Sequence, residues 1–217
     1  MRSRKHTAWK KSRTFGDVFG GRTSPKITDR IVNRVHSLRA PGPGIETPIL
    51  IEDNPSRDYY FPLSIEECRT ALHALPASHY EGLTHLWLRR PSGVDRRNGL
   101  PLAEFLCGSG VRLIVMYPWR VDRRTCLGRL RPAGNLAREL ERFGATFVRD
   151  RGWWYAQLDP DALREYYLHV LYHEVGHHLD WYQRRWSAAN MKQVEAAADQ
   201  YAVRFLQSGK TVLGQLD

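Results

Sequence analysis

Hydrophobic and polar residues alternate with a period of two in several stretches of the chain. The stretch 83–90, LTHLWLRR, alternates as a half-buried strand does, and 111–119, VRLIVMYPW, is the strongest strand candidate. A short run at 47–52, TPILIE, has a similar β-like character. The segment 145–158, ATFVRDRGWWYAQL, predicts a hairpin that turns at 150–152. These stretches together predict a small sheet.

Two shorter helices are expected among these strands. Residues 64–75 begin with Ser64 and Glu67 in the spacing of a capping box, and they end before a proline. Residues 134–143 are expected to form another helix, which a following glycine ends. Helices placed between strands are typical of a mixed α and β architecture.

Beyond the hairpin the hydrophobic period changes from two to 3.6. Pro160 suits the first position of a helix, and from there to Arg185 the only Gly or Pro is Gly176. A last helix is expected over 189–207, stopping near Gly209. The sequence therefore predicts an α+β fold, a small mixed β-sheet followed by a long helix and a second helix.

Positive charge is concentrated at the start of the chain. The first 40 residues hold eleven Lys and Arg against two Asp, which accounts for nine of the net charge of +10. The chain therefore divides into a basic, flexible tail at 1–44 and a domain at 45–217. Basic stretches bind phosphates without needing a fold, so nucleic acid is a candidate partner of the tail. The candidate contacts are Arg2, Arg4, Lys5, Lys10, Lys11 and Arg13.

The cysteines and the apolar runs indicate in which cellular compartment the protein is expected. Three cysteines without a CxxC pair argue against a disulfide framework and against a thiolate zinc site. The basic start is followed by no apolar region of a secretory signal, and no uncharged apolar run reaches the length of a membrane span. We therefore expect a cytoplasmic protein without a membrane partner; the sequence indicates no oligomeric state.

The long helix contains the motif that indicates chemistry. His173, Glu174 and His177 form an H-E-x-x-H motif, which is typical of zinc metalloproteases. Residues four apart lie on one helix face, so the two imidazoles can bind one zinc ion, and Glu174 can reach a water held there as general base. Composition alone would produce this motif in roughly one such chain in fifty, so the motif needs further support.

The next helix offers that support. Glu195 follows eighteen residues after His177, and packing of the two helices would bring it to the metal as a third ligand. Asp199, one turn further on, is a candidate hydrogen-bond acceptor for the far nitrogen of a ligand histidine, with His173 favoured. Of the neighbouring histidines, His169 is expected only to line the pocket and His178 to point away.

H-E-V-G-H followed by E-A-A-A-D-Q-Y-A resembles the gluzincin zinc metallopeptidases over about 50 residues. The resemblance implies His173, His177 and Glu195 as ligands of one Zn²⁺, Glu174 as base and Asp199 behind the ligands. The motif helix looks like that of the lethal-factor and titration-factor types, and the second helix is nearer to the ImmA/IrrE type. No subfamily is assigned.

The resemblance also implies features outside the motif. Gluzincins place an edge strand along the substrate cleft, and 152–158, GWWYAQL, is the candidate here. Such enzymes also use a Tyr or His to stabilise the oxyanion, for which Tyr155 and Tyr201 are the candidates.

The expected function is hydrolysis of peptide bonds by a zinc-bound water, with Glu174 as base, in a specific intracellular protein. Two alternatives remain. One is a nucleic-acid-associated peptidase similar to the SprT-like crosslink-repair group, in which the basic tail finds the substrate. The other is a non-catalytic DNA or RNA binder whose zinc is structural.

Overall fold

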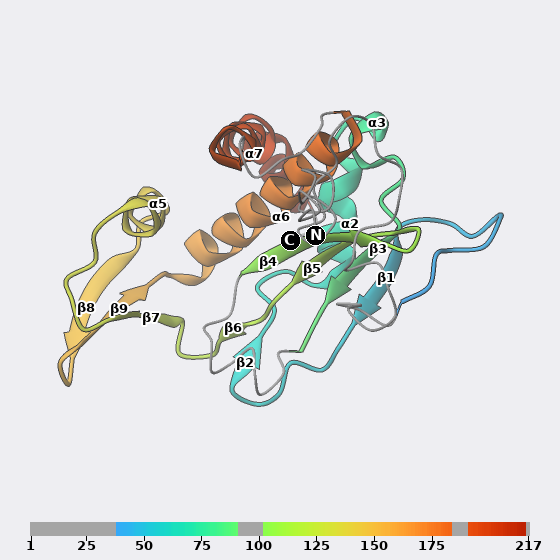
Figure 1. The fold of residues 1–217 in the computed structure, drawn as a ribbon. Helices are drawn as coiled ribbons and strands as arrows, with labels where there is room; N and C mark the ends of the chain where they lie inside the picture. The colour runs from blue at the N-terminus through green and yellow to red at the C-terminus, as the bar shows by residue number, and fades with distance from the viewer. Residues whose placement is uncertain (1–37, 91–101, 184–190, 216–217) are drawn as a thin grey trace, which may run out of the picture.

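The described part of the chain comprises residues 38–90, 102–183 and 191–215 of a computed structural model (Figure 1). It combines helices with small mixed sheets, so the predicted α+β class is confirmed. The six candidate phosphate contacts of the tail lie outside the described residues. The strands are β1 (Ile49–Glu52), β2 (Tyr59–Tyr60), β3 (His85–Leu88), β4 (Ala103–Gly108), β5 (Val111–Met116), β6 (Trp119–Arg120), β7 (Arg124–Gly128), β8 (Thr146–Asp150) and β9 (Trp153–Gln157). The helices are α2 (Ile65–His73), α3 (Ala77–Tyr80), α5 (Asn135–Arg142), α6 (Pro160–Gln183) and α7 (Met191–Leu213).

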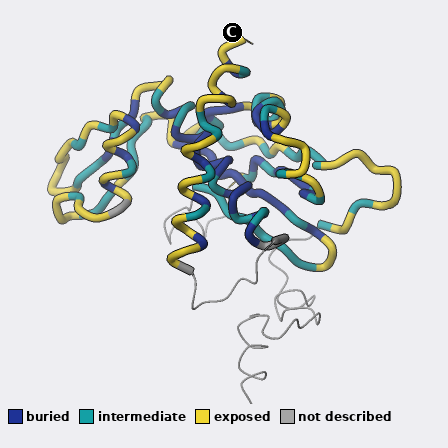
Figure 2. The backbone as a smooth tube through the Cα atoms, turned by 90° about the horizontal axis from the view of Figure 1, so that it is seen from above, coloured by how far each residue is buried: buried dark blue, intermediate teal, exposed yellow. Residues whose placement is uncertain are grey.

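The main sheet has four strands in the order β1-β3-β5-β4. The first three are parallel, and β4 pairs antiparallel with β5 at the edge. β5 is apolar at nearly every position because both of its faces are covered. Ile114 and Met116 pack into the main core with α2 and α6, while Leu113 and Val115 pack with Trp87 on the other face. Figure 2 shows that buried positions gather in the middle of the molecule and exposed ones around its outside.

A second sheet, of three antiparallel strands in the order β7-β9-β8, extends away from the main sheet (Figure 1). The predicted hairpin is present between β8 and β9. Arg151 and Gly152 have φ angles of 47° and 83°, as in the two-residue turns that match the twist of paired strands. The expected edge strand at 152–158 is wrong, because β9 is the central strand of this sheet and has a partner on both sides. The outer strands of these two sheets are β1 and β4 in the main sheet and β7 and β8 in the second.

Helix α2 has the capping box that the sequence predicts. The hydroxyl of Ser64 accepts a hydrogen bond from the backbone N–H of Glu67, and the carboxylate of Glu67 accepts one from the backbone N–H of Ser64. Glu67 also accepts a hydrogen bond from the guanidinium of Arg164 in α6. The cap therefore fixes the start of α2 and joins it to α6.

We expect Glu67→Gln to lower the free energy of unfolding by about 1–2 kcal/mol at pH 7. Burial raises the pKa of Glu67, but the Ser64 N–H, Arg164 and the Ser64 hydroxyl together bring it below its usual value. The charged carboxylate therefore stabilises the fold above the unfolded pKa, and this contribution is lost as the pH falls through the lower folded pKa. Urea titrations at pH 7 and at lower pH should show the difference from the parent shrinking in acid.

The adjacent Glu66→Gln is the matched control. Glu66 pairs with the exposed Arg69 one turn away, so its removal should change the free energy of unfolding by less than about 1 kcal/mol. Equal losses in Glu67→Gln and Glu66→Gln would contradict a special role for the link between α2 and α6.

Helix α6 lies against β4 and β5 of the main sheet, and α7 packs on α6 (Figure 1). α7 ends at Leu213 rather than near Gly209, so the expected helix end is wrong. A Cβ at Gly209 would lie 2.9 Å from Cζ of Tyr172, so this glycine permits close packing on α6 and does not end the helix. No helix in the described ranges is both long and apolar enough to cross a membrane.

Candidate metal centre

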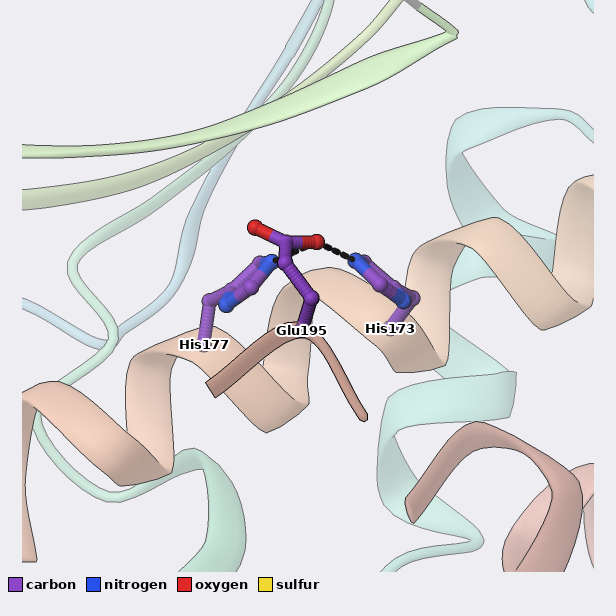
Figure 3. A group of neighbouring side chains, drawn as sticks. All are labelled: His173, His177 and Glu195. Atoms are coloured by element: carbon purple, nitrogen blue, oxygen red, sulfur yellow. Dashed lines mark ion pairs between the residues drawn. The ribbon is translucent and has the colours of Figure 1, made fainter. Parts of the chain in front are cut away.

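The two motif histidines project from α6 toward one carboxylate of α7 (Figure 3). One carboxylate oxygen of Glu195 lies 3.4 Å from Nε2 of His173 and 3.6 Å from Nε2 of His177. The ligand atoms of these three residues all lie within 4.8 Å of one another. Ligand atoms that are about 2.0–2.1 Å from a tetrahedral zinc ion are roughly 3.3 Å apart. The three side chains therefore have a spacing that fits one metal ion.

Asp199 fixes the orientation of His173. One of its carboxylate oxygens lies 2.8 Å from Nδ1 of His173, so Nδ1 donates a hydrogen bond to it and Nε2 keeps its lone pair toward Glu195. Burial lowers the pKa of His177, with His173 adding to the effect and Glu195 opposing it. A neutral imidazole is the form that binds a metal. The ring orientation of His173 and the neutral form of His177 are thus both suited to ligation.

Glu174 lies beside these ligands, under the edge strand β4. Its side chain is nearly buried, and its carboxylate accepts a hydrogen bond from the backbone N–H of Phe105. Burial raises the pKa of Glu174 to about 8; the Phe105 N–H lowers it, and the nearby Glu195 and Glu104 raise it. A carboxyl group with a raised pKa next to a metal position is suited to taking up and releasing a proton near neutral pH.

The close approach of α6 and α7 is what brings the third carboxylate into place. Gly176 faces Ala198, and a Cβ at position 176 would lie 2.8 Å from the Cα of Ala198. Ala198 and Ala202 are fully buried in this contact zone. Since Ala198 lies between Glu195 and Asp199 on α7, small residues at the contact let both carboxylates reach the histidines.

A cleft with a volume of about 810 Å³ opens beside the metal cluster. Three consecutive residues of β7 line it, namely Arg124, Thr125 and Cys126. Neighbouring residues of a strand point to opposite faces, so the open edge of β7, and not one of its faces, is turned toward the cleft. Leu102 and Ala103, at the start of β4, line another part of the wall. The cleft therefore has strand edges from two sheets along it.

The structure adds cleft residues that sequence reasoning missed. Glu139 of α5 and Tyr166 of α6 both line the cleft, and the Tyr166 hydroxyl donates a hydrogen bond to Glu139. Tyr166 could have been found from its spacing, since it precedes His173 by two helical turns on the same face. Glu139 had no such signal, because only the folded chain brings α5 to α6.

The two neighbouring histidines are placed differently. His169 is buried and lines the cleft, where burial and then Arg142 and His173 lower its pKa to about 4, with Asp199 opposing them. His178 lies within 3.0 Å of the backbone carbonyl of Glu81, away from the cluster. Neither joins the group of three ligands.

The two candidates for oxyanion stabilisation do not lie with the cluster. Tyr201 is on α7, but its hydroxyl is 2.9 Å from Nδ1 of His79 and its ring packs against Phe205. Tyr155 is in the centre of the three-stranded sheet, opposite Cys126 and Val148. Neither tyrosine lines the cleft.

Two histidines, the carboxylates of Glu195 and Asp199, and the buried Glu174 thus come together beside an open cleft. Comparison of the chain with protein-family models, with curated proteins and with solved structures finds no match.

Proposed function

We propose that this protein is a zinc metallopeptidase that hydrolyses peptide bonds. The observation that supports it is the convergence of His173, His177 and Glu195 at a spacing that fits one zinc ion, beside a buried Glu174 in an open cleft. Two ligands come from one helix and a third from the next, so a fourth coordination position would stay open on the cleft side. Catalytic zinc sites keep such an open position, whereas structural sites are closed by four protein ligands.

The residues of the site would have separate roles in the proposed hydrolysis. A zinc ion at this position would lower the pKa of a bound water to about 7 and polarise the substrate carbonyl. Glu174 would take the proton of the attacking water and pass it to the leaving amine. The Phe105 N–H would hold the Glu174 carboxylate in place, and Asp199 would hold the ring of His173. All these groups belong to helices or a strand, which hold functional side chains more precisely than loops do.

The cleft also suits an extended peptide. The outer edge of β4 has no strand partner among the described residues, and Phe105 in that strand bonds to Glu174. A peptide added as a strand along β4 would therefore pass the base and the metal position, with backbone hydrogen bonds providing affinity. None of the three cysteines is in a disulfide, which agrees with a substrate in a reducing, cytoplasmic compartment.

The test of this proposal is metal-dependent proteolysis by the full chain. The purified protein should contain one zinc ion per chain, and it should generate new protein N-termini in a cell extract. Removal of zinc with a chelator should abolish these N-termini, and zinc added back should restore them. New N-termini that persist without metal, or their absence with one zinc bound, would refute the proposal.

We expect Asp199→Asn to weaken zinc binding by about tenfold or more, because the far nitrogen of His173 then loses its charged acceptor. Competition with a chromophoric chelator measures the affinity. Asp161→Asn is the matched control, since Asp161 is exposed in the first turn of α6. Equal zinc affinities of the two variants would contradict the role given to Asp199.

A nucleic-acid-associated peptidase is the second candidate. The observation that favours it is a set of exposed arginines on α5, β8 and the loops beside them: Arg131, Arg138, Arg149 and Arg151. Deleting residues 1–40 and replacing these four arginines by Gln in the same protein separates the candidates. If the protein is guided by DNA, its salt-dependent DNA affinity should collapse while zinc binding stays intact. No DNA affinity in the full chain would remove this candidate.

A further inference from the structure

Glu139 is a carboxylate of the cleft that the proposed zinc chemistry does not use. It projects from α5 into the same cleft as His173, Glu174 and Asp199. It is close enough to His173 and Asp199 for their charges to act on it. The Tyr166 hydroxyl donates a hydrogen bond to it and so fixes its position. Glu139 therefore lies in the wall near the site of bond cleavage.

Two arginines of the cleft wall pair with acidic residues other than Glu139. Arg120 lines the cleft but is bound to Asp122 through three hydrogen bonds of 2.7–3.2 Å. Arg124 also lines the cleft, and its guanidinium lies 3.8 Å from Asp150. Each of these two arginines thus has an acidic neighbour of its own.

Arg142, one turn along α5 from Glu139, lies over the ring of Phe143 at 5.1 Å. Among the described residues, no Lys or Arg forms an ion pair with Glu139. Burial raises the pKa of Glu139; the bond from Tyr166 and the charges of His173 and Arg142 only partly offset this effect. The cleft therefore holds a desolvated carboxylate that a cation from outside would stabilise.

The walls near Glu139 suit the stem of a long side chain. Trp119, Leu136, Leu140 and Val170 line the same cleft and offer apolar surface. Lysine and arginine bury their methylene groups along such surface while the charged end reaches a carboxylate. A short or acidic side chain would leave the Glu139 charge without a partner.

We propose that Glu139 is a specificity-determining residue that selects a lysine or arginine side chain of the substrate next to the bond that is cleaved. This inference rests on the proposed peptidase function. The selected side chain would lie along the apolar wall, with its charged end at the Glu139 carboxylate. The Tyr166 hydroxyl would position that carboxylate.

The first experiment is cleavage-site profiling of the zinc-loaded full chain on a library of proteome-derived peptides. We expect Lys and Arg to be enriched at one fixed position beside the cleaved bond. Glu139→Gln should lower kcat/KM for those peptides by about ten- to hundredfold, and Glu139→Lys should shift the preference to Asp and Glu. Glu141→Gln, an exposed position on the same helix, is the matched control and should keep the parent preference.

A binding measurement tests the role of Glu139 independently of peptide hydrolysis. The zinc-loaded Glu174→Gln variant is titrated with Ac-Ala-Ala-Xaa-Ala-Ala-NH₂ peptides in which Xaa is Lys, Arg, Gln or Glu. The Lys and Arg peptides should bind about tenfold more tightly than the Gln peptide, and this difference should disappear when Glu139→Gln is added. Zinc content is measured in each variant, so that a damaged metal site is recognised.

The outcomes separate the two proposals. If the parent cleaves peptides without a basic preference, and the binding series shows none, the role of Glu139 is wrong while the peptidase function stands. If no peptide is cleaved but Lys and Arg peptides bind through Glu139, the cleft selects cations and the peptidase function fails. If neither cleavage nor selective binding is seen, both are wrong.

Discussion

Replacing Glu174 by Gln is expected to leave one zinc ion bound and to lower the rate of peptide hydrolysis by about 10²–10⁴-fold. Gln has the shape of Glu and can still accept the hydrogen bond from the Phe105 N–H, so the fold and the three ligands should be preserved. It cannot take a proton from the attacking water. Zinc content and kcat, measured on the same preparation, check the two halves of this prediction.

Glu165→Gln is the matched control for this change. It alters the same functional group on the same helix, but Glu165 pairs with Lys210 of α7 and does not line the cleft. It should keep both zinc and hydrolysis. If Glu174→Gln cleaves substrate as fast as the parent, Glu174 is not the base. If it loses zinc, its effect on the rate says nothing about proton transfer.

The raised pKa of Glu174 explains why a metal should matter for its protonation. Burial raises the pKa to about 8, so without a neighbouring cation the carboxyl group is largely protonated at neutral pH. A divalent cation held by His173, His177 and Glu195 would favour the charged form, as any opposite charge at short range does. The base would then be available when the metal is bound.

Local sequence signals predicted helices, strands and turns well where all residues of the signal lie close together within one element. The capping box at Ser64 and Glu67, the turn at Arg151 and Gly152, and the apolar run of β5 are each present in the structure. Each depends on residues close together in the chain. Such signals do not depend on how the remaining elements pack.

The elements that were missed depend on packing. β4, AEFLCG, is partly buried at every position, so it lacks the alternation that marks a strand. β7 is short and interrupted by a register shift between Cys126 and Gly128. α7 was expected to end near Gly209, but the close contact with Tyr172, and not helix termination, accounts for this glycine. Tertiary contacts thus overrode the local pattern.

The residues of the site and the cleft divide in the same way, into those that local spacing predicts and those that only packing brings together. His173, Glu174 and His177 lie within one turn of one helix, so their spacing alone predicts their proximity. Glu195 required the further assumption that two consecutive helices pack, which α6 and α7 do. Glu139 could not be found in this way, because it reaches the cleft from α5, a helix whose place relative to α6 no local pattern indicates.

Gly176→Ala is expected to destabilise the protein by about 1–3 kcal/mol, because the added methyl group would meet the α7 backbone at Ala198. Helix propensity alone predicts the opposite sign, a gain of about 1 kcal/mol for Ala over Gly in a helix interior. The steric contact should outweigh the gain in helix propensity, because the added Cβ would lie 2.8 Å from the Cα of Ala198. A backbone atom cannot move aside as the end of a flexible side chain would. Urea titration of the metal-free protein measures the change.

The same substitution should weaken zinc binding by about tenfold or more, since Glu195 and Asp199 are on the stretch of α7 that must move away from α6. Gly42→Ala is the control: a Cβ there would have no neighbour closer than 4.0 Å, so stability should change by about 0.5 kcal/mol at most, with zinc affinity unaltered. A more stable Gly176→Ala protein with full zinc affinity would show that the close approach of α6 and α7 does not hold the third ligand in place.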